Sequence, residues 1–187
     1  MAAFFLAFLT TLLAEMGDKT QLVTLTLSSR FPPRQVLAGA LAALAAITAP
    51  AVVLGDFLAQ LLPDKVALIA SGCFFVVAGT LMLFWSKSTG TPAQKRGSTV
   101  VVQTFLLIFF AELGDKTQLT AIALTAATGE PLSVFLGAMG GQFINHAAAA
   151  YLGSRFLTRL PAGTVRLASA LLFVLFGVLF LFLAVRS

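Results

Sequence analysis

The sequence contains the segment E-M-G-D-K-T-Q-L at residues 15–22 and repeats it as E-L-G-D-K-T-Q-L at residues 112–119. Seven of the eight positions are identical, and each copy lies inside a long apolar stretch. Ionisable groups near the middle of a membrane segment cost roughly 2.5–3.5 kcal/mol each, even on lenient insertion scales. A charged cluster that occurs twice in this setting therefore predicts an ion-binding site.

The composition is typical of a membrane protein. Of the 187 residues, 59% are hydrophobic and 10% are charged, and the mean hydropathy is +0.99. These values exclude a water-soluble domain. A run of about 20 apolar residues spans roughly 30 Å of hydrocarbon, so we predict an all-α integral membrane protein with six transmembrane helices. The runs lie near residues 3–27, 36–62, 66–86, 100–126, 132–158 and 164–185.

The similarity between the two halves of the chain extends beyond the motif. Gly39 matches Gly137 and Gly79 matches Gly177 at an offset of 98, whereas the two motif copies are 97 residues apart. The chain is therefore predicted to consist of a first three-helix repeat (residues 1–86), a cytoplasmic linker (87–99) and a second three-helix repeat (100–187). Because each repeat crosses the membrane an odd number of times, the two copies must have opposite orientations, as in transporters that bind substrate between inverted repeats.

Basic residues lie mainly on one side of the predicted bundle. Loops one, three and five carry eight of them, and the other side carries only Lys65 and Arg186. The positive-inside rule then places these three loops in the cytoplasm and both termini outside. This asymmetry accounts for the net charge of +5, so we predict no nucleic-acid partner. The eight residues are Arg30, Arg34, Lys87, Lys95, Arg96, Arg155, Arg159 and Arg166.

The start of the chain does not resemble a cleaved signal peptide. No basic segment precedes the first apolar run, and that run contains the charged motif. We therefore expect it to remain in the mature protein.

Four carboxylates are the candidate metal ligands, namely Glu15, Asp18, Glu112 and Asp115. Acidic residues three apart share one face of a helix, so inverted packing would bring the two pairs together. Carboxylates, hydroxyls and amide carbonyls are hard oxygen donors that suit Mn²⁺, Ca²⁺ or Mg²⁺, whereas a single cysteine and a single histidine do not favour a zinc or copper site. The additional candidate ligands are Thr20, Gln21, Thr117 and Gln118.

The charge of this cluster is suited to exchange. Four carboxylates and the two motif lysines, Lys19 and Lys116, sum to minus two, so one divalent cation or two protons would neutralise it. Crowded carboxylates take up protons more readily than isolated ones. Each lysine follows its glutamate by four residues, which favours an ion pair, and it would compensate charge or tether a carboxylate between transport steps. Purely structural salt bridges would leave excess negative charge in lipid.

Gly17 and Gly114 lie in the middle of the motif segments, where glycine destabilises a helix by about 0.5–1 kcal/mol relative to alanine. Either a neighbouring helix packs closely against each glycine, which we favour, or the helix unwinds there and offers backbone carbonyls. Gly137 and Gly141 form a GxxxG pair, which we expect to pack against the motif helices.

His146 lies in the fifth predicted span, next to Asn145 and opposite Ile47 and Thr48 of the first repeat. It therefore falls outside the symmetric core. Two roles are open for it, a proton relay or a hydrogen-bonded packing residue. The Phe-rich segment 173–182 is expected to face lipid.

The twin E-x-G-D-K-T-Q segments resemble the signature of the Golgi-type calcium and manganese/proton antiporter family, and the resemblance covers essentially the whole chain. It implies export of cytoplasmic Mn²⁺, or of Ca²⁺, against inward proton flow, with the metal as substrate and no prosthetic group. The four motif carboxylates match the acidic positions of the family. The short linker and ends are similar to the bacterial manganese exporters, which implies a prokaryotic plasma membrane.

We therefore expect a secondary antiporter that works by alternating access, with a divalent cation, protons and the lipid bilayer as its partners. Two other functions fit the same residues. These are Ca²⁺/H⁺ exchange and export of an amino acid or other organic cation, because acidic intramembrane sites also attract ammonium groups. An intramembrane enzyme is disfavoured, since the sequence offers no evident pair of nucleophile and base. No feature of the sequence indicates an oligomeric state.

Overall fold

The computed structural model describes residues 1–84, 99–152 and 162–186. Within these residues the chain is all-helical, as the sequence predicts. The predicted linker lies outside the described residues, except for Thr99. The helices are α1 (Ala2–Ala14), α2 (Lys19–Ser28), α3 (Pro33–Leu61), α4 (Asp64–Phe84), α5 (Val100–Glu112), α6 (Lys116–Thr128), α7 (Pro131–Leu152) and α9 (Ala162–Arg186).

The first and fourth predicted spans are each two helices instead of one. α1 and α2 together occupy the first span, α5 and α6 together occupy the fourth, and a motif copy lies at each junction. The other boundaries lie close to those predicted, because the turns carry residues that begin or end helices. Pro33 begins α3, and Gly129 ends α6 in the left-handed conformation, with a φ of 64°. Residues 153–158 of the fifth predicted span lie outside the described residues.

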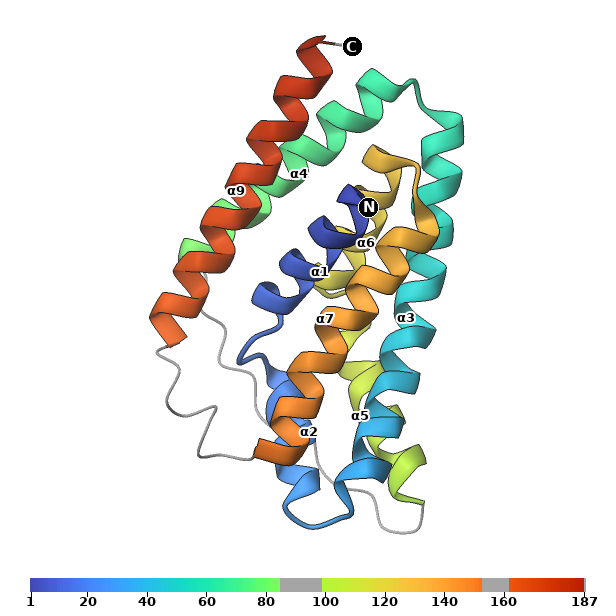
Figure 1. The fold of residues 1–187 in the computed structure, drawn as a ribbon, viewed down its shortest axis with the longest axis vertical. Coiled ribbons are helices and arrows are strands. Elements are labelled where there is room, and N and C mark those ends of the chain that lie inside the picture. The colour runs from blue at the N-terminus through green and yellow to red at the C-terminus, as the bar shows by residue number, and fades with distance from the viewer. Residues whose placement is uncertain (85–98, 153–161, 187) are drawn as a thin grey trace.

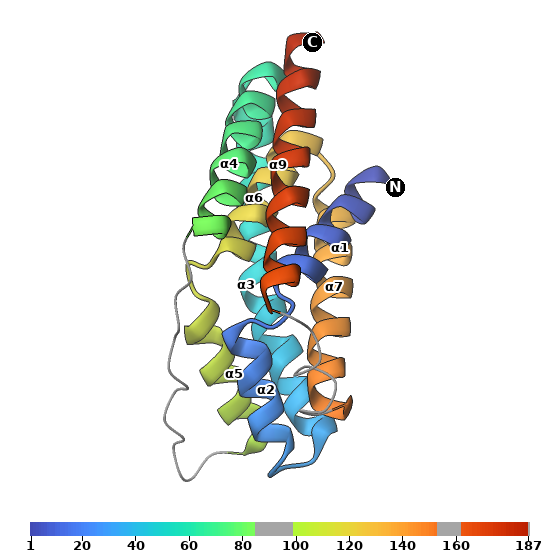
Figure 2. The same ribbon diagram turned by 90° about the vertical axis from the view of Figure 1, so that its left-hand side faces the viewer.

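The two broken helices run antiparallel through the middle of the molecule (Figure 1). The chain runs down along α1 and α2 and up along α5 and α6, so the two junctions lie at a similar height (Figure 2). α3 packs against both α5 and α6, and α7 packs against both α1 and α2. The broken helix α5–α6 therefore packs against α3 of the first half of the chain, and the broken helix α1–α2 packs against α7 of the second half.

Glycines allow these exchanged helices to approach closely. A Cβ on Gly39 of α3 would collide with the carbonyl oxygen of Val101 in α5. A Cβ on Gly137 of α7 would collide in the same way with the carbonyl oxygen of Phe4 in α1. Phe4 and Val101 are equivalent positions at the motif offset of 97. Small residues let helix backbones touch, and the predicted packing of Gly137 against a motif helix is confirmed.

α4 and α9 form a separate pair at one side of the bundle (Figures 1 and 2). The ring of Phe75 in α4 lies 5.2 Å from that of Phe173 and 5.8 Å from that of Phe180 in α9, measured between centroids. All three side chains are buried. The expectation that segment 173–182 faces lipid is therefore wrong for Phe173 and Phe180. The residues of α9 itself are apolar on every face of the helix, so the sequence pattern does not show which face packs against α4.

Two helices in the described part of the chain are long and apolar enough to cross a membrane by themselves, α3 and residues 64–81 of α4. Their most apolar windows have mean hydropathies of 2.2 and 1.6. The amino group of Met1 lies 3.7 Å from the Glu130 carboxylate, so the N-terminus and the α6–α7 turn share one end of the molecule. The α2–α3 turn lies at the opposite end (Figure 1).

Candidate metal centre

Both motif segments break at the motif glycine. α1 and α2 are joined through Gly17, with a φ of 78°, and α5 and α6 are joined through Gly114, with a φ of 79°. Only glycine adopts this left-handed backbone readily. A Cβ at either position would meet nothing within 4 Å, so close packing, the explanation favoured from sequence, is wrong. The glycines are there because the helices unwind.

The motif glutamines stabilise these junctions. Oε1 of Gln21 accepts the N–H of Gly17 at 2.6 Å, and Oε1 of Gln118 accepts the N–H of Gly114 at 2.9 Å. Each bond satisfies a backbone donor at the point where the helix is interrupted. Gln21 and Gln118 were predicted as additional metal ligands. In this structure their amide oxygens instead bind the backbone of their own junctions.

The four predicted acidic residues meet between the two junctions. Glu15, Asp18, Glu112 and Asp115 each offer one carboxylate oxygen, and these oxygens all lie within 4.8 Å of one another. The glutamates are each 2% exposed, and Oε2 of Glu15 and Oε1 of Glu112 are buried without a hydrogen-bond partner. Such oxygens are costly unless a cation or a proton satisfies them. The donor set therefore fits a hard divalent cation or protons.

The spacing of the carboxylates predicts that each pair shares one face of a helix. The structure differs from this prediction. Glu15 caps the C-terminus of α1, and Asp18 directly precedes α2. Glu112 ends α5, and Asp115 caps the N-terminus of α6. Each pair therefore spans a junction, and the ends of four helices converge on the cluster. The aspartates lie at helix N-termini, where the helix dipole favours negative charge.

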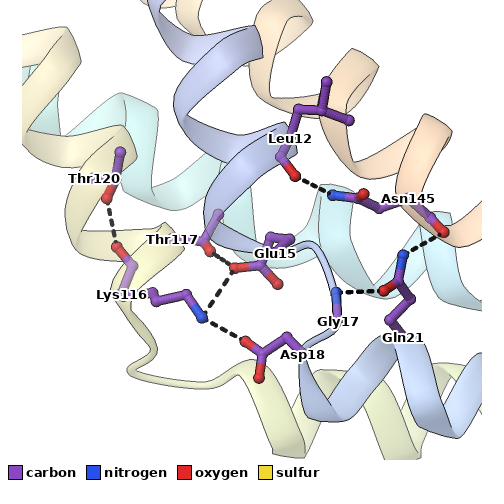
Figure 3. A network of polar contacts seen from close by, with 9 residues as sticks. All are labelled: Leu12, Glu15, Gly17, Asp18, Gln21, Lys116, Thr117, Thr120 and Asn145. Carbon is purple, nitrogen blue, oxygen red and sulfur yellow. Dashed lines mark hydrogen bonds and ion pairs between the residues drawn. The ribbon is translucent and has the colours of Figure 1, made fainter. Parts of the chain in front are cut away.

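Lys116 contacts the acidic residues of the first motif copy (Figure 3). Its Nζ lies 2.6 Å from Oδ2 of Asp18 and 3.9 Å from Oε1 of Glu15. The hydroxyl of Thr117 also donates a hydrogen bond to Oε1 of Glu15. An ion pair between Lys116 and Glu112 was predicted, but the ion pairs that the described residues form do not include it. The break at the junction places the two residues on different helices.

The first motif copy does not reproduce all of these contacts. Thr20 is fully buried beside Glu112, but the two side chains do not meet hydrogen-bond geometry. The side chain of Lys19, predicted to compensate charge, lies outside the described residues. Thr20 and Thr117 both lie next to the acidic cluster, and their role as additional ligands stays a prediction.

α7 adds polar groups that the motif does not contain. His146 is 1% exposed, and its Nδ1 lies 2.7 Å from the hydroxyl of Thr24 in α2. Its role as a proton relay stays a prediction. Asn145 is also buried and binds both Leu12 and Gln21 (Figure 3). Sequence reasoning noted Asn145 only as a neighbour of His146, although a lone amide in an apolar span is itself a signal of buried hydrogen bonding.

These features define a class of protein. Two interrupted helices that cross in antiparallel orientation and gather carboxylates at their breaks are typical of secondary transporters that bind cations. The family model described as "Divalent cation/proton antiporter GDT1" matches residues 3–90 and 100–187. The chain therefore belongs to the GDT1 family of divalent cation/proton antiporters, which are membrane transporters and not enzymes. The resemblance drawn from the twin motifs is confirmed.

Individual relatives agree with this assignment. The chain is 33% identical to the GDT1-like protein sll0615 of Synechocystis, over 95% of this chain and 96% of the relative. It is 32% identical to a protein of Vibrio cholerae named "Putative manganese exporter", over 94% of this chain and 88% of that protein. It is 29% identical to GDT1-like protein 5 of Oryza sativa, over 90% of this chain and 89% of that protein. No solved structure gave a significant match.

Proposed function

We propose that this protein exports Mn²⁺ from the cytoplasm in exchange for protons. The observation that carries the proposal is the convergence of Glu15, Asp18, Glu112 and Asp115 within 4.8 Å between two helix breaks. A set made only of oxygen donors suits a hard divalent cation, which is the transported substrate. The similarity to the Vibrio protein, at 32% identity over 94% of the chain, supports manganese as that substrate.

Exchange follows from the charge of the cluster. Four ionised carboxylates carry minus four, and the Lys116 ammonium in contact with them returns plus one. A buried cluster with net negative charge is unstable unless cations or protons neutralise it. One divalent cation and two protons change the charge by the same amount. They are therefore alternative occupants, and the arrival of one releases the other.

Alternating access requires two halves that move against each other. We assign the six spans to α1–α2, α3, α4, α5–α6, α7 and α9, and we divide them between inverted repeats at residues 1–86 and 100–187. The separate matches of the family model to residues 3–90 and 100–187 support this division. So do the reciprocal glycine contacts of α3 with α5 and of α7 with α1. The junctions at Gly17 and Gly114 would then lie near the middle of the bilayer.

The proposed location is the plasma membrane of a prokaryote, with loops one, three and five in the cytoplasm and both termini outside. The basic residues of those loops are the basis of this orientation. The ion pair between Met1 and Glu130 supports the placement of the N-terminus on the same side as the α6–α7 turn, which is loop four of the predicted topology.

The test is proton flux in proteoliposomes that contain the purified protein and a pH-sensitive dye. Mn²⁺, Ca²⁺ and Mg²⁺ are added to the wild type and to the variants Glu15→Gln, Asp115→Asn and Glu130→Gln. Glu130 serves as the matched control because its carboxylate is 46% exposed and lies at the α6–α7 turn, away from the cluster. We expect Mn²⁺-driven flux in the wild type and the control, and none in the two cluster variants.

Each other outcome has a defined meaning. Flux with Ca²⁺ and not with Mn²⁺ would identify a Ca²⁺/H⁺ exchanger. Uptake of ⁵⁴Mn²⁺ without movement of protons would contradict exchange. No flux with any of the metals would contradict the proposal and favour export of an organic cation.

A further inference from the structure

The two helix breaks differ although the motif copies are nearly identical. α1 ends at Ala14, and the next residue, Glu15, has a φ of −92° and a ψ of −8°. α5 continues one position further, through Glu112, which is the equivalent of Glu15, and the following Leu113 is extended with a ψ of 117°. The motif copies differ only at Met16 and Leu113, which lie at the junctions themselves, and neither of these side chains can donate a hydrogen bond to a backbone carbonyl.

The difference involves one backbone carbonyl, that of Leu12. In a continuous helix it would accept the N–H of Met16, but this N–H bonds to the carbonyl of Leu13 instead, at 3.3 Å. The Leu12 carbonyl accepts a hydrogen bond from Nδ2 of Asn145 in α7, at 2.9 Å. At the second junction the equivalent carbonyl, that of Phe109, accepts the N–H of Leu113 within its own segment, at 3.1 Å.

Asn145 holds both sides of the first junction. Its side chain binds Leu12 at the end of α1, and its backbone carbonyl accepts a hydrogen bond from Nε2 of Gln21 in α2 at 2.9 Å. The other end of the same amide, Oε1 of Gln21, accepts the N–H of Gly17 at 2.6 Å. A chain of hydrogen bonds therefore runs from α1 through α7 to α2 and back to the glycine of the break (Figure 3). Asn145 is 2% exposed, so water cannot readily replace these bonds.

The other repeat lacks this device. The residue of α3 at the position of Asn145 is Ile47, at the offset of 98, and an isoleucine side chain has no group that can donate to a carbonyl. Among the described residues, three backbone N–H groups of the second junction bond within their own segment. These are Gly114 N–H to Gln118, Leu113 N–H to Phe109, and Asp115 N–H to Glu112.

We infer that Asn145 is a positioning residue for one half of the metal centre. By fixing the end of α1 and the start of α2 to α7, it sets where Glu15 and Asp18 lie, although it does not touch the metal itself. The inference rests on the proposed function and makes the two half-sites unequal. Glu15 and Asp18 are tied to α7 by the hydrogen bonds of Asn145, whereas Ile47 of α3 cannot make the equivalent side-chain bond to the junction between Glu112 and Asp115. Hydrogen-bonded supports of this kind typically change metal affinity or activity by roughly 10- to 100-fold when they are removed.

The first test measures the junction directly, by hydrogen–deuterium exchange of the full-length protein in detergent micelles. Asn145→Leu removes the donor at similar volume, and Asn145→Asp keeps the shape but replaces the donor with an acceptor. Ile47→Leu is the matched control at the equivalent position of α3. We expect exchange in residues 12–21 to become at least about tenfold faster in both Asn145 variants. Exchange in residues 109–118 should stay unchanged, and the control should alter neither segment.

The second test measures transport in proteoliposomes. We expect both Asn145 variants to raise the KM for Mn²⁺ by roughly 10-fold or more, with kcat within about threefold of the wild type, because the ligands are all present but poorly placed. Gln21→Leu removes the second arm of the same chain of bonds and should act in the same direction. A uniform loss of kcat with unchanged KM would indicate a merely structural role and overturn the inference.

The exchange measurement also separates this inference from the proposed function. If the wild type carries no Mn²⁺, the proposed function fails, but the exchange of residues 12–21 still shows whether Asn145 holds the junction. If the wild type carries Mn²⁺ and the Asn145 variants keep the wild-type exchange rate in residues 12–21, the inference is wrong. Equal loosening of both junctions would also overturn it, because that result indicates general destabilisation.

Discussion

Substitution of Gly17 tests whether the helix break builds the site. Its φ is 78°, and a Cβ there would meet nothing within 4 Å, so a substitution introduces backbone strain without a steric clash. A left-handed L-residue costs roughly 1–2 kcal/mol, and asparagine tolerates this conformation better than alanine because its side chain hydrogen-bonds locally. We therefore expect the stability of the variants to fall from Gly17→Asn to Gly17→Ala to Gly17→Val, although asparagine is larger than alanine.

The expected magnitude follows from the strain alone. Gly17→Ala should lower the free energy of unfolding by about 1–2 kcal/mol, which for a chain of this length is a fall of roughly 2–8 °C in Tm. Circular dichroism at 222 nm in detergent measures the transition. Gly114, with a φ of 79° and the same open surroundings, should show the same order. Gly137 is the opposite case, because a side chain there collides with the backbone of Phe4, and asparagine should be worse than alanine.

One result would refute this reasoning. If Gly17→Ala unfolds at the wild-type temperature, or if Gly17→Asn is less stable than Gly17→Ala, the junction is not left-handed. The motif would then lie on a continuous helix, and the carboxylates would have to meet by a different arrangement.

Three other perturbations test the surroundings of the cluster. Lys116→Met should bind Mn²⁺ at least about tenfold more tightly in titration calorimetry, because two unit charges 4 Å apart interact by roughly 4 kcal/mol at an effective dielectric constant of 20 and each 1.4 kcal/mol is tenfold. Lys116→Arg should not, and weaker binding by the methionine variant would contradict the position of the ammonium group. Gly39→Ala should lower the free energy of unfolding by about 1–3 kcal/mol through overpacking against α5, as chemical denaturation would show. The Kd for Mn²⁺ should rise between pH 8 and pH 6 because protons and metal compete for the same carboxylates, and a Kd independent of pH would argue against exchange.

The candidate site was largely predictable because charged residues in an apolar segment are energetically costly and therefore indicate a function. Glu15, Asp18, Glu112 and Asp115 are identified by their repetition, and the all-oxygen chemistry follows from the residue types. The antiparallel relation of the motif segments is what the predicted odd number of spans in each repeat requires. The contact of Gly137 with α1 follows from its small size. These conclusions depend on composition and spacing, which the sequence contains in full.

The tertiary structure decided how the pieces meet. Glycine accepts both helical and left-handed backbone at little cost, so the sequence does not distinguish close packing at Gly17 from a break. In the sequence, Glu112 lies four residues before Lys116. The ion pair of Lys116 is nevertheless with Asp18, because the break places Glu112 on a different helix. The inequality of the two junctions depends on Asn145, which lies 124 residues beyond Gln21 and reaches it only through the packing of α7 on α1 and α2. The sequence by itself thus determined which groups form the cluster, whereas long-range packing determined their partners and the shape of the backbone that carries them.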